Sequence, residues 1–388
     1  MSGTDTHHSS RTSLAYFAVA MFLVGIEMAE TGAALERMTR VLDLAPQQQG
    51  LLVSVRFIGG LFIGFALWAG HARVRFSWVL GGALLLVVTS GPFLFGSSYE
   101  AALVISTMRG LSMGAIIPLS GMFAAAQTRW AAGLVAAAVN ATLSAGMVIL
   151  SLFASVLAAQ LNVVWQVYWA PASVLAAALL VLLPFVRFPA AAPPASASSG
   201  GSAGGSPLSR TQWGYAAAGL LLVGSEGVIL GLLPAQTVEL AAAGLGGEIL
   251  ALFLMAGFLS GRIVGISLFT RMSPDFVLSV SAGAVITSAV LWSGFPAASP
   301  VFLFLIGVST SNLFPGMISH ISAHKPERAG ATIAAFGWTG GLGGTVVPAL
   351  TGAALGIGLA TRVVTAFIIV PTLGAYLFAV VAGRNRGR

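Results

Sequence analysis

The sequence predicts an all-α membrane protein with twelve transmembrane helices in two bundles of six. Only 7% of its 388 residues are charged, whereas soluble globular domains carry about 25%. Mean hydropathy is +0.94, and twelve apolar stretches each come close to the roughly 20 residues that a membrane span needs. A carboxylate in one stretch, followed by a guanidinium in the next, occurs once in each half of the chain.

The twelve stretches follow one another with short polar interruptions. The first is too long and too rich in glutamate for a cleaved signal peptide, so we expect a retained helix. The predicted helices cover residues 14–35, 50–69, 77–95, 101–126, 131–157, 163–186, 213–235, 249–269, 276–295, 301–321, 330–355 and 361–382.

One low-complexity segment divides the twelve helices into six and six. Residues 189–209 are rich in alanine, proline, serine and glycine, a composition typical of a flexible linker. We therefore expect an N-terminal bundle over residues 1–188, a linker over 189–210 and a C-terminal bundle over 211–388.

The basic residues predict the orientation in the membrane. With the N-terminus inside, twelve of the 18 Lys and Arg residues fall on the cytoplasmic side, three on the outer side and three within spans. This distribution obeys the positive-inside rule and places both termini and the linker in the cytoplasm. We therefore expect a multi-pass protein of the cytoplasmic (inner) membrane. The net charge of +7 forms no basic patch, so no nucleic-acid partner is expected.

The repeated charges stand in matching sequence. Val24-Gly25-Ile26-Glu27 is followed by Gly32, and Val223-Gly224-Ser225-Glu226 is followed at the same interval by Gly231. The next predicted helices carry Arg56 and Arg262, each two residues after a serine. Charges inside a membrane are costly and are usually paired or functional. We predict structural ion pairs between Glu27 and Arg56 and between Glu226 and Arg262.

Two further charges lack a counterpart in the repeat. Glu30 corresponds to Ile229, and alignment of the two helices on their prolines sets Ile306 opposite Arg109. A single proton or solute needs a single asymmetric site, so these residues are functional candidates, a third structural pair being the alternative. Glu30 and Glu27, three residues apart on one helical face, are the candidates for proton coupling, and Arg109 for substrate binding.

Other polar residues in the predicted spans are candidates for contacts with a solute. An amide or an aromatic ring suits a polar or sugar-like ligand, although lone polar residues in membranes also serve as hydrogen-bond partners between helices. These candidates are Asn140, Asn312, Trp338 and Tyr168. Four glycine pairs with small-xxx-small spacing predict close helix packing: Gly60/Gly64, Gly110/Gly114, Gly257/Gly261 and Gly340/Gly344.

Several kinds of chemistry are not expected. The chain has no cysteine, which excludes disulfides and thiolate metal sites. His320 and His324 flank a predicted cytoplasmic loop and suggest a pH sensor, but without a convergent third ligand they predict no metal site. No nucleotide-binding loop or nucleophile–base pattern is present, so we expect neither an enzyme nor a cofactor, and no ATP coupling within the chain.

The whole pattern resembles the major facilitator superfamily. Two six-helix halves joined by a cytoplasmic linker and a repeated motif carry the resemblance. It implies a pseudo-two-fold axis along the membrane normal and a solute site between the halves. The run from Gly261 to Pro274, the Glu226 motif and Asn312-Leu313-Phe314-Pro315 are similar to the fucose-permease-like sugar symporters. The loop from Gly70 to Phe76 keeps the family's basic residues and lacks its aspartate.

The resemblance implies a proton-coupled secondary active transporter that moves a small polar solute, sugar-like or organic, by alternating access. Three alternatives stay open. The glycine-rich run from Gly337 to Pro348 looks like the nitrate/nitrite transporter signature and favours a small anion. An exporter of a drug-like or metabolite substrate is the second alternative, and a non-transporting membrane sensor is the third. Expected partners are a small-molecule substrate, protons and the lipid bilayer, with the chain as a monomer.

Overall fold

The computed structural model shows a bundle of long helices. It describes residues 3–70, 75–125, 132–160, 164–188, 209–238, 245–324, 329–359 and 362–384, and contains no strand among them. A helix satisfies its own backbone hydrogen bonds, which is what a chain crossing lipid requires. The predicted linker lies almost wholly outside the described residues.

We call residues 3–188 the first half of the chain. Polar residues start its second membrane segment, where Pro46 occupies the first turn of α2 and the Gln48 side chain accepts a hydrogen bond from the backbone N–H of Ala45. The elements of the first half are α1 (Gly3–Leu42), α2 (Pro46–Ser54), η1 (Val55–Phe57), α3 (Ile58–Gly70), α4 (Phe76–Ser90), η3 (Gly91–Phe95), α5 (Tyr99–Ala125), α6 (Ala132–Gln160), α7 (Gln166–Leu182) and η4 (Leu183–Phe185).

We call residues 209–384 the second half. Ser209 and Gln212 form a reciprocal capping box at the start of α8, and Ser273 caps α11. The elements are α8 (Arg210–Gly227), the π-helical η6 (Val228–Leu232), α9 (Leu233–Val238), α10 (Gly247–Arg271), α11 (Pro274–Gly294), η7 (Pro296–Ala298), α12 (Ser299–Thr310), α13 (Leu313–His324), α14 (Ala329–Gly356) and α15 (Val363–Arg384).

Among the described residues, 11 segments are long and apolar enough to cross a membrane. They match eleven of the twelve predicted spans. The remaining prediction, 50–69, lies within α2, η1 and α3, which are continuously helical over Pro46–Gly70 but are not among those segments. Large apolar side chains cover the outside of the bundle, including Trp78, 75% exposed, and Val174, 71% exposed. Such a surface fits lipid, and the protein is a multi-pass membrane protein.

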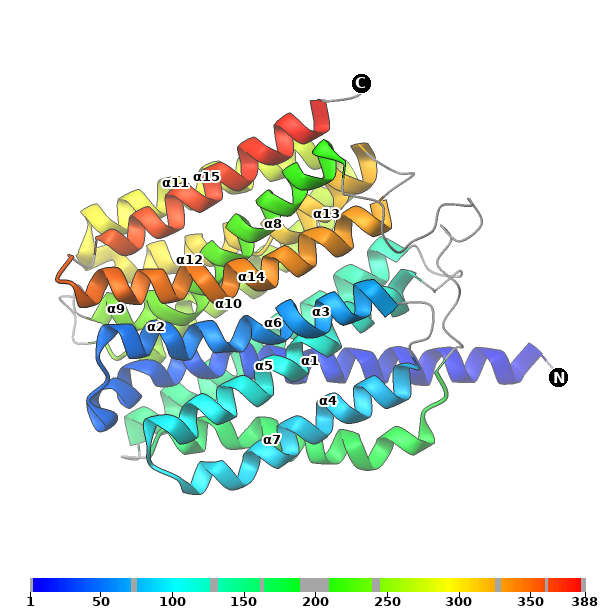
Figure 1. Ribbon diagram of the computed structural model, residues 1–388, viewed down its shortest axis with the longest axis horizontal. Coiled ribbons are helices and arrows are strands. Elements are labelled where there is room, and N and C mark those ends of the chain that lie inside the picture. The colour runs from blue at the N-terminus through cyan, green and yellow to red at the C-terminus, as the bar shows by residue number, and fades with distance from the viewer. Residues whose placement is uncertain are drawn as a thin grey trace.

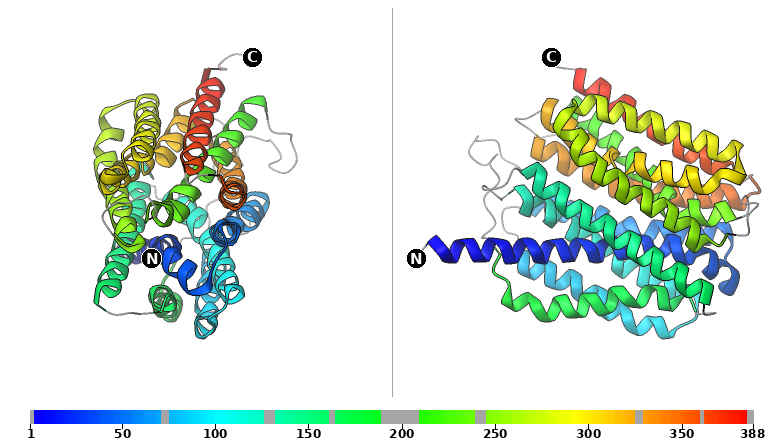
Figure 2. Two further views of the ribbon diagram at one scale, coloured as in Figure 1. Left: turned by 90° about the vertical axis from the view of Figure 1, so that its left-hand side faces the viewer. Right: turned by 180° about the vertical axis from the view of Figure 1, so that it is seen from behind.

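The helices of the two halves lie largely on opposite sides of the molecule, the first half in blue to green and the second in green to red (Figures 1 and 2). Both termini lie at one end of the bundle, which we call the terminus end, and the opposite end is the far end. The ribbons of the two halves lie close together at the far end and spread apart toward the terminus end.

Matching glycines pack the helices within each half. A Cβ atom on Gly110 of α5 would collide with the backbone carbonyl of Arg56, and one on Gly307 of α12 would collide with that of Leu254 on α10. A Cβ on Gly257 of α10 would likewise collide with the Phe304 carbonyl of α12, so the predicted close packing of Gly110 and Gly257 is confirmed.

Glycines also bring the two halves together. A Cβ on Gly32 of α1 would collide with the Leu230 carbonyl of η6, and one on Gly50 of α2 would lie 2.6 Å from the Pro348 carbonyl oxygen of α14. Further toward the terminus end, a Cβ on Gly60 would lie 3.1 Å from the Cα of Gly341. These close approaches bring the backbones of the two halves into direct contact at several points along α1, α2 and α3.

Three membrane segments change helix type near their middles. The 3₁₀ turn η1 carries Arg56, the π-helical η6 begins two residues after Glu226, and the chain turns at Ser311 and Asn312 between α12 and α13. Short 3₁₀ and π segments inside long helices mark hinges and functional sites. In this protein they stand beside the charged residues that the repeat singled out.

Candidate functional site

A buried ionic network occupies the middle of the first half. The Glu30 carboxylate on α1, fully buried, accepts a hydrogen bond at 3.0 Å between its Oε2 and Nη2 of Arg56. Its other oxygen, Oε1, accepts from Nη1 of Arg109 on α5. Two guanidinium groups from different elements therefore share one carboxylate.

Arg109 has a partner for every nitrogen of its guanidinium group. Nε lies 3.3 Å from Oγ of Ser90, and Nη2 donates to the backbone carbonyl of Trp169 at 2.8 Å and to Oγ of Ser173 at 2.9 Å. Its side chain is fully buried. Four of its five N–H groups thus have acceptors within the protein, so Arg109 acts here as a structural cation.

The indole ring of Trp169 on α7 completes the network. The guanidinium carbons of Arg56 and Arg109 lie 5.5 and 5.6 Å from its ring centroid, within the range of cation–π contacts. Its Nε1 donates to the backbone carbonyl of Glu30 at 3.3 Å. Trp169 is not among the residues predicted from the sequence, although Trp165 and Trp169 stand four residues apart on one helical face. Their ring centroids lie 5.2 Å apart.

Glu27 is not the partner of Arg56 that the repeat predicts. Nη1 of Arg56 donates to the backbone carbonyl of Glu27, while the guanidinium bonds the carboxylate of Glu30, one turn further along α1. Arg56 therefore pairs with the carboxylate of Glu30, whose other oxygen accepts from Arg109. Both carboxyl oxygens of Glu27 are buried without a hydrogen-bond partner among the described residues.

The described residues of the second half form no equivalent of this network. No ion pair within 4.0 Å joins Glu226 to Arg262 among the described residues, and Nε and Nη1 of Arg262 are buried without acceptors. The repeated sequence is therefore not accompanied by repeated contacts: the Glu30 carboxylate is bonded by two guanidinium groups, whereas Arg262 and Glu226 are not in direct contact.

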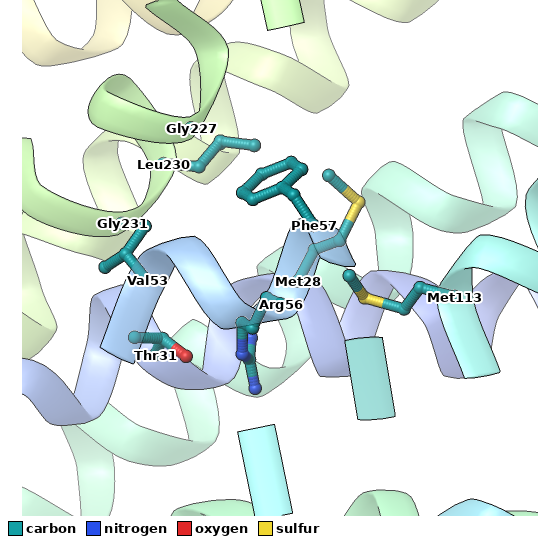
Figure 3. A pocket seen from close by; sticks show the side chains of 9 residues that line it. All are labelled: Met28, Thr31, Val53, Arg56, Phe57, Met113, Gly227, Leu230 and Gly231. Carbon is teal, nitrogen blue, oxygen red and sulfur yellow. The ribbon is translucent and has the colours of Figure 1, made fainter. Parts of the chain in front are cut away.

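A small cavity lies where the network faces the second half (Figure 3). Its volume is about 20 Å³, and its walls come from α1, α2, η1, α5, α8 and η6. About 10–15 Å³ is enough for one water molecule. Nε of Arg56 and Oγ1 of Thr31 lack protein partners among the described residues, so water is the natural occupant. The lining residues are Met28, Thr31, Val53, Arg56, Phe57, Met113, Gly227, Leu230 and Gly231.

Polar contacts join the two halves at the far end. Nε of Arg37 on α1 lies 3.2 Å from Oε1 of Glu248 on α10, and the Tyr168 hydroxyl donates to the same oxygen at 3.3 Å. Nε2 of Gln236 on α9 donates to Oε1 of Gln49 on α2 at 3.2 Å. These contacts close the far end between the halves.

The other sequence candidates lie outside the central cavity. Tyr168 belongs to the far-end contacts. Asn312 donates to the Val308 carbonyl at 3.1 Å and packs against Gly265, so it supports the break between α12 and α13. The ring centroids of Trp338 on α14 and Phe65 on α3 lie 5.6 Å apart, so these two side chains pack together across the two halves. Asn140 is half-buried on α6, a helix that packs against α1 and α10.

Comparison with known proteins agrees with this architecture. The profile of the Major Facilitator Superfamily matches residues 14–348, well over half of the chain. The chain belongs to the major facilitator superfamily. No curated protein sequence is significantly similar to it.

Solved members of the superfamily share the fold of this chain. A structure of the nucleoside transporter NupG superposes with a TM-score of 0.71 at 11% identity, covering 95% of this chain and 99% of that chain. A variant of the E. coli fucose:proton symporter FucP superposes with a TM-score of 0.67 at 16% identity, covering 98% of this chain and 100% of that chain. A bacterial homologue of the human lysosomal transporter Spinster, inward-facing and occupied, superposes with a TM-score of 0.65 at 12% identity. The match covers 96% of this chain and 94% of that chain.

At these identities the structural likeness shows the fold alone. The expected resemblance to fucose-permease-like members of the major facilitator superfamily is confirmed at that level. A transporter of this superfamily, rather than an enzyme, is what the family and the fold indicate.

Proposed function

We propose that this protein is a secondary active transporter of a small polar solute, sugar-like or organic, across the cytoplasmic membrane. In this proposal twelve helices form two six-helix bundles related by a pseudo-two-fold axis, and the bundles rock about a central site in alternating access, coupled to protons. The chain acts as a monomer with both termini in the cytoplasm. Membership of the superfamily and the glycine-lined contact between the halves support this proposal.

The observation that carries proton coupling is the fully buried Glu27 carboxyl, which lacks a hydrogen-bond partner among the described residues although it lies beside the network of Glu30, Arg56 and Arg109. Burying an ionised carboxylate without a partner is costly. We therefore assign the proton to Glu27 in the state closed at the far end. The proton leaves when movement of the halves admits water. Glu30, held by two arginines, acts as a positioning residue, since releasing it would break two buried pairs.

The solute site in this proposal lies between the halves, at the level of the cavity beside Arg56. A cavity of about 20 Å³ is far below the roughly 300–1,000 Å³ of ordinary ligand pockets. The state described here is thus the closed one at this level. Separation of the halves toward the terminus end, where the ribbons already spread (Figure 1), makes room for the solute.

Arg262 favours a second candidate, transport of a small anion. Its guanidinium has two buried nitrogens without acceptors among the described residues, whereas Arg56 and Arg109 are tied to Glu30. An unpaired buried guanidinium binds a carboxylate or an oxyanion well, because its planar donors match such groups. Glu226 on the neighbouring helix has no ion-pair partner in the described part of the chain and would oppose an anion there.

The experiment that tests the proposal uses the purified chain in liposomes that enclose a pH-sensitive dye. Fucose, uridine and nitrate serve as probes of the sugar, nucleoside and anion classes. We expect one neutral probe to move protons with it and to accumulate when an inward proton gradient is imposed. Uptake of nitrate alone would replace the first candidate by the second. Binding of a probe without any flux would indicate a sensor and overturn both candidates.

A further inference from the structure

A cluster of three side chains lies at the terminus end of the second half, apart from the network and the cavity. Asp275 is in the first turn of α11, and His320 and His324 are in the last two turns of α13. One ligand atom from each residue lies within 4.8 Å of the others. The two histidines are four residues apart, so they share one face of their helix.

Backbone carbonyls hold one nitrogen of each imidazole ring. Nε2 of His320 lies 3.1 Å from the carbonyl oxygen of Ala379 on α15, and Nδ1 of His324 lies 3.0 Å from the carbonyl oxygen of His320. A carbonyl oxygen only accepts hydrogen bonds, so these two nitrogens carry the hydrogens. The tautomer of each neutral ring is thereby fixed.

The other nitrogen of each ring faces the same carboxylate. Nδ1 of His320 lies 2.7 Å from Oδ1 of Asp275, and Nε2 of His324 lies 3.5 Å from Oδ2. In the neutral tautomers these nitrogens carry lone pairs. Two lone pairs and a carboxylate that meet at such distances repel one another unless positive charge lies among them.

We propose that Asp275, His320 and His324 bind a divalent transition-metal ion of the Zn²⁺ class. Two imidazole nitrogens and one carboxylate oxygen are a common ligand set for zinc and for iron(II), with further positions open to water. Metal-binding histidines almost always donate their other N–H to a carbonyl or carboxylate. Both histidines of this cluster do so. The harder ions Mg²⁺ and Ca²⁺ prefer all-oxygen ligands and fit less well.

Access to the site is from the water at the terminus end. The side chain of Asp275 is 56% exposed and that of His324 is 13% exposed, while His320 is buried at 3%. A bound ion joins α11 to α13, and the Ala379 carbonyl extends the link to α15. The ion therefore holds α13, the helix that follows the break at Asn312, against α11 and α15.

The test uses the full chain in detergent, purified without a histidine tag. His7, His8 and His71 are replaced by Gln, so that His320 and His324 are the only remaining histidines of the five. Co²⁺ and Zn²⁺ are the probes. We expect Co²⁺ to bind one per chain with visible d–d absorption, Zn²⁺ to displace it, and Zn²⁺ to raise the midpoint of thermal unfolding.

Three variants identify the ligands. Asp275→Asn, His320→Gln and His324→Gln should each weaken Co²⁺ binding by more than the roughly 10–100-fold typical of lost outer-shell partners. Glu248→Gln, at the far end, should bind as the parent does. Absence of Co²⁺ absorption in the parent, or unchanged affinity in Asp275→Asn and His324→Gln, would overturn the site. Both of these side chains reach solvent, so these two variants are expected to fold even if His320→Gln does not.

Discussion

The Arg56 side chain joins two successive turns of α1. Its Nη2 lies 3.0 Å from Oε2 of Glu30, and its Nη1 donates to the backbone carbonyl of Glu27. The 3₁₀ turn η1 is thereby fixed to α1 at the depth where the two halves meet. The carboxyl group of Glu27 is left beside this clamp without a donor of its own.

The first prediction concerns the stability of the network. Arg109→Ala leaves the fully buried Glu30 with Arg56 alone and removes the contacts with Ser90, Ser173 and Trp169. Removing one partner of a buried ion pair typically costs about 3–5 kcal/mol. We expect a large fall in the midpoint of thermal unfolding in detergent and a low yield of folded protein.

The matched control is Arg40→Ala. Arg40 pairs with Glu36 at 2.8 Å, but its side chain is 66% exposed, and exposed pairs contribute about 0–1 kcal/mol. The midpoint of thermal unfolding of Arg40→Ala should hardly differ from that of the parent. Equal midpoints for the two variants would show that the Glu30 network does not stabilise the fold.

The second prediction separates the two glutamates of α1. Glu27→Gln keeps the shape of a side chain that has no ionic partner, so the protein should fold, bind solute and exchange it across the membrane. It should fail to concentrate solute against a gradient, because the amide cannot carry a proton. Glu30→Gln leaves two buried guanidinium groups without their carboxylate and should destabilise the protein instead.

The measurements are counterflow exchange and proton-driven accumulation in liposomes, with thermal unfolding for each variant. Accumulation by Glu27→Gln at the parental level would remove Glu27 from the coupling mechanism. A stable Glu30→Gln protein that exchanges without accumulating would transfer the role to Glu30.

The third prediction tests closure of the far end. Gln49 and Gln236 bond across the halves at 3.2 Å, and the chain has no native cysteine. The double variant Gln49→Cys/Gln236→Cys should therefore cross-link in membranes with an oxidant or a short bifunctional thiol reagent. Transport should stop on cross-linking and return on reduction, because alternating access requires this contact to open.

Each single-cysteine variant serves as the control. One cysteine cannot cross-link the two halves, so the reagent should leave transport unchanged. Full transport by a quantitatively cross-linked double variant would contradict the proposal that the halves separate here.

Much of the fold could be predicted from composition and periodicity, and some of the site. Apolar stretches of span length predicted the helices, because lipid leaves the chain few alternatives. The absence of a repeat counterpart picked out Glu30 and Arg109, which do contact each other. Only the comparison of the two repeats indicated Glu30 and Arg109, since the contact between their helices is not visible in the sequence.

The contacts of Arg262 could not be predicted in this way. The motifs around Arg56 and Arg262 match in sequence, yet Arg56 bonds the Glu30 carboxylate and Arg262 makes no ion pair with Glu226 within 4.0 Å among the described residues. A matching sequence does not determine which side chains of neighbouring helices meet. The third ligand of the histidine cluster was missed for a similar reason, because Asp275 comes from a helix 45 residues earlier.

The fourth prediction concerns Arg262 and the choice of solute. Arg262→Ala removes a buried cation that has no acceptor at two of its nitrogens among the described residues, and thermal unfolding of the variant checks that it folds. If the guanidinium binds an acidic group of the solute, affinity for that solute should fall and transport of neutral probes should not. Unchanged affinity for every acidic or anionic probe would exclude Arg262 from the binding site.

The fifth prediction changes the balance between the closed and open far end. A Cβ on Gly231 of η6 would collide with the side chain of Val53 on α2, so Gly231→Ala forces the Val53 side chain, and with it the contact between the two halves, to shift. Overpacking of this kind costs about 1–3 kcal/mol, and the cost falls on the closed state only. Each 1.4 kcal/mol changes a population ratio about tenfold, so the open state should become roughly 5- to 100-fold more populated.

The measurement is the rate at which a thiol reagent labels Gln49→Cys from outside the cell, with and without Gly231→Ala. Labelling should become faster, since Gln49 is 6% exposed in the closed state. Gly283→Ala is the matched control, because a Cβ at that position on α11 meets nothing within 4 Å and should leave labelling unchanged. Equal labelling rates in the two glycine variants would show that the contact between η6 and α2 does not control closure.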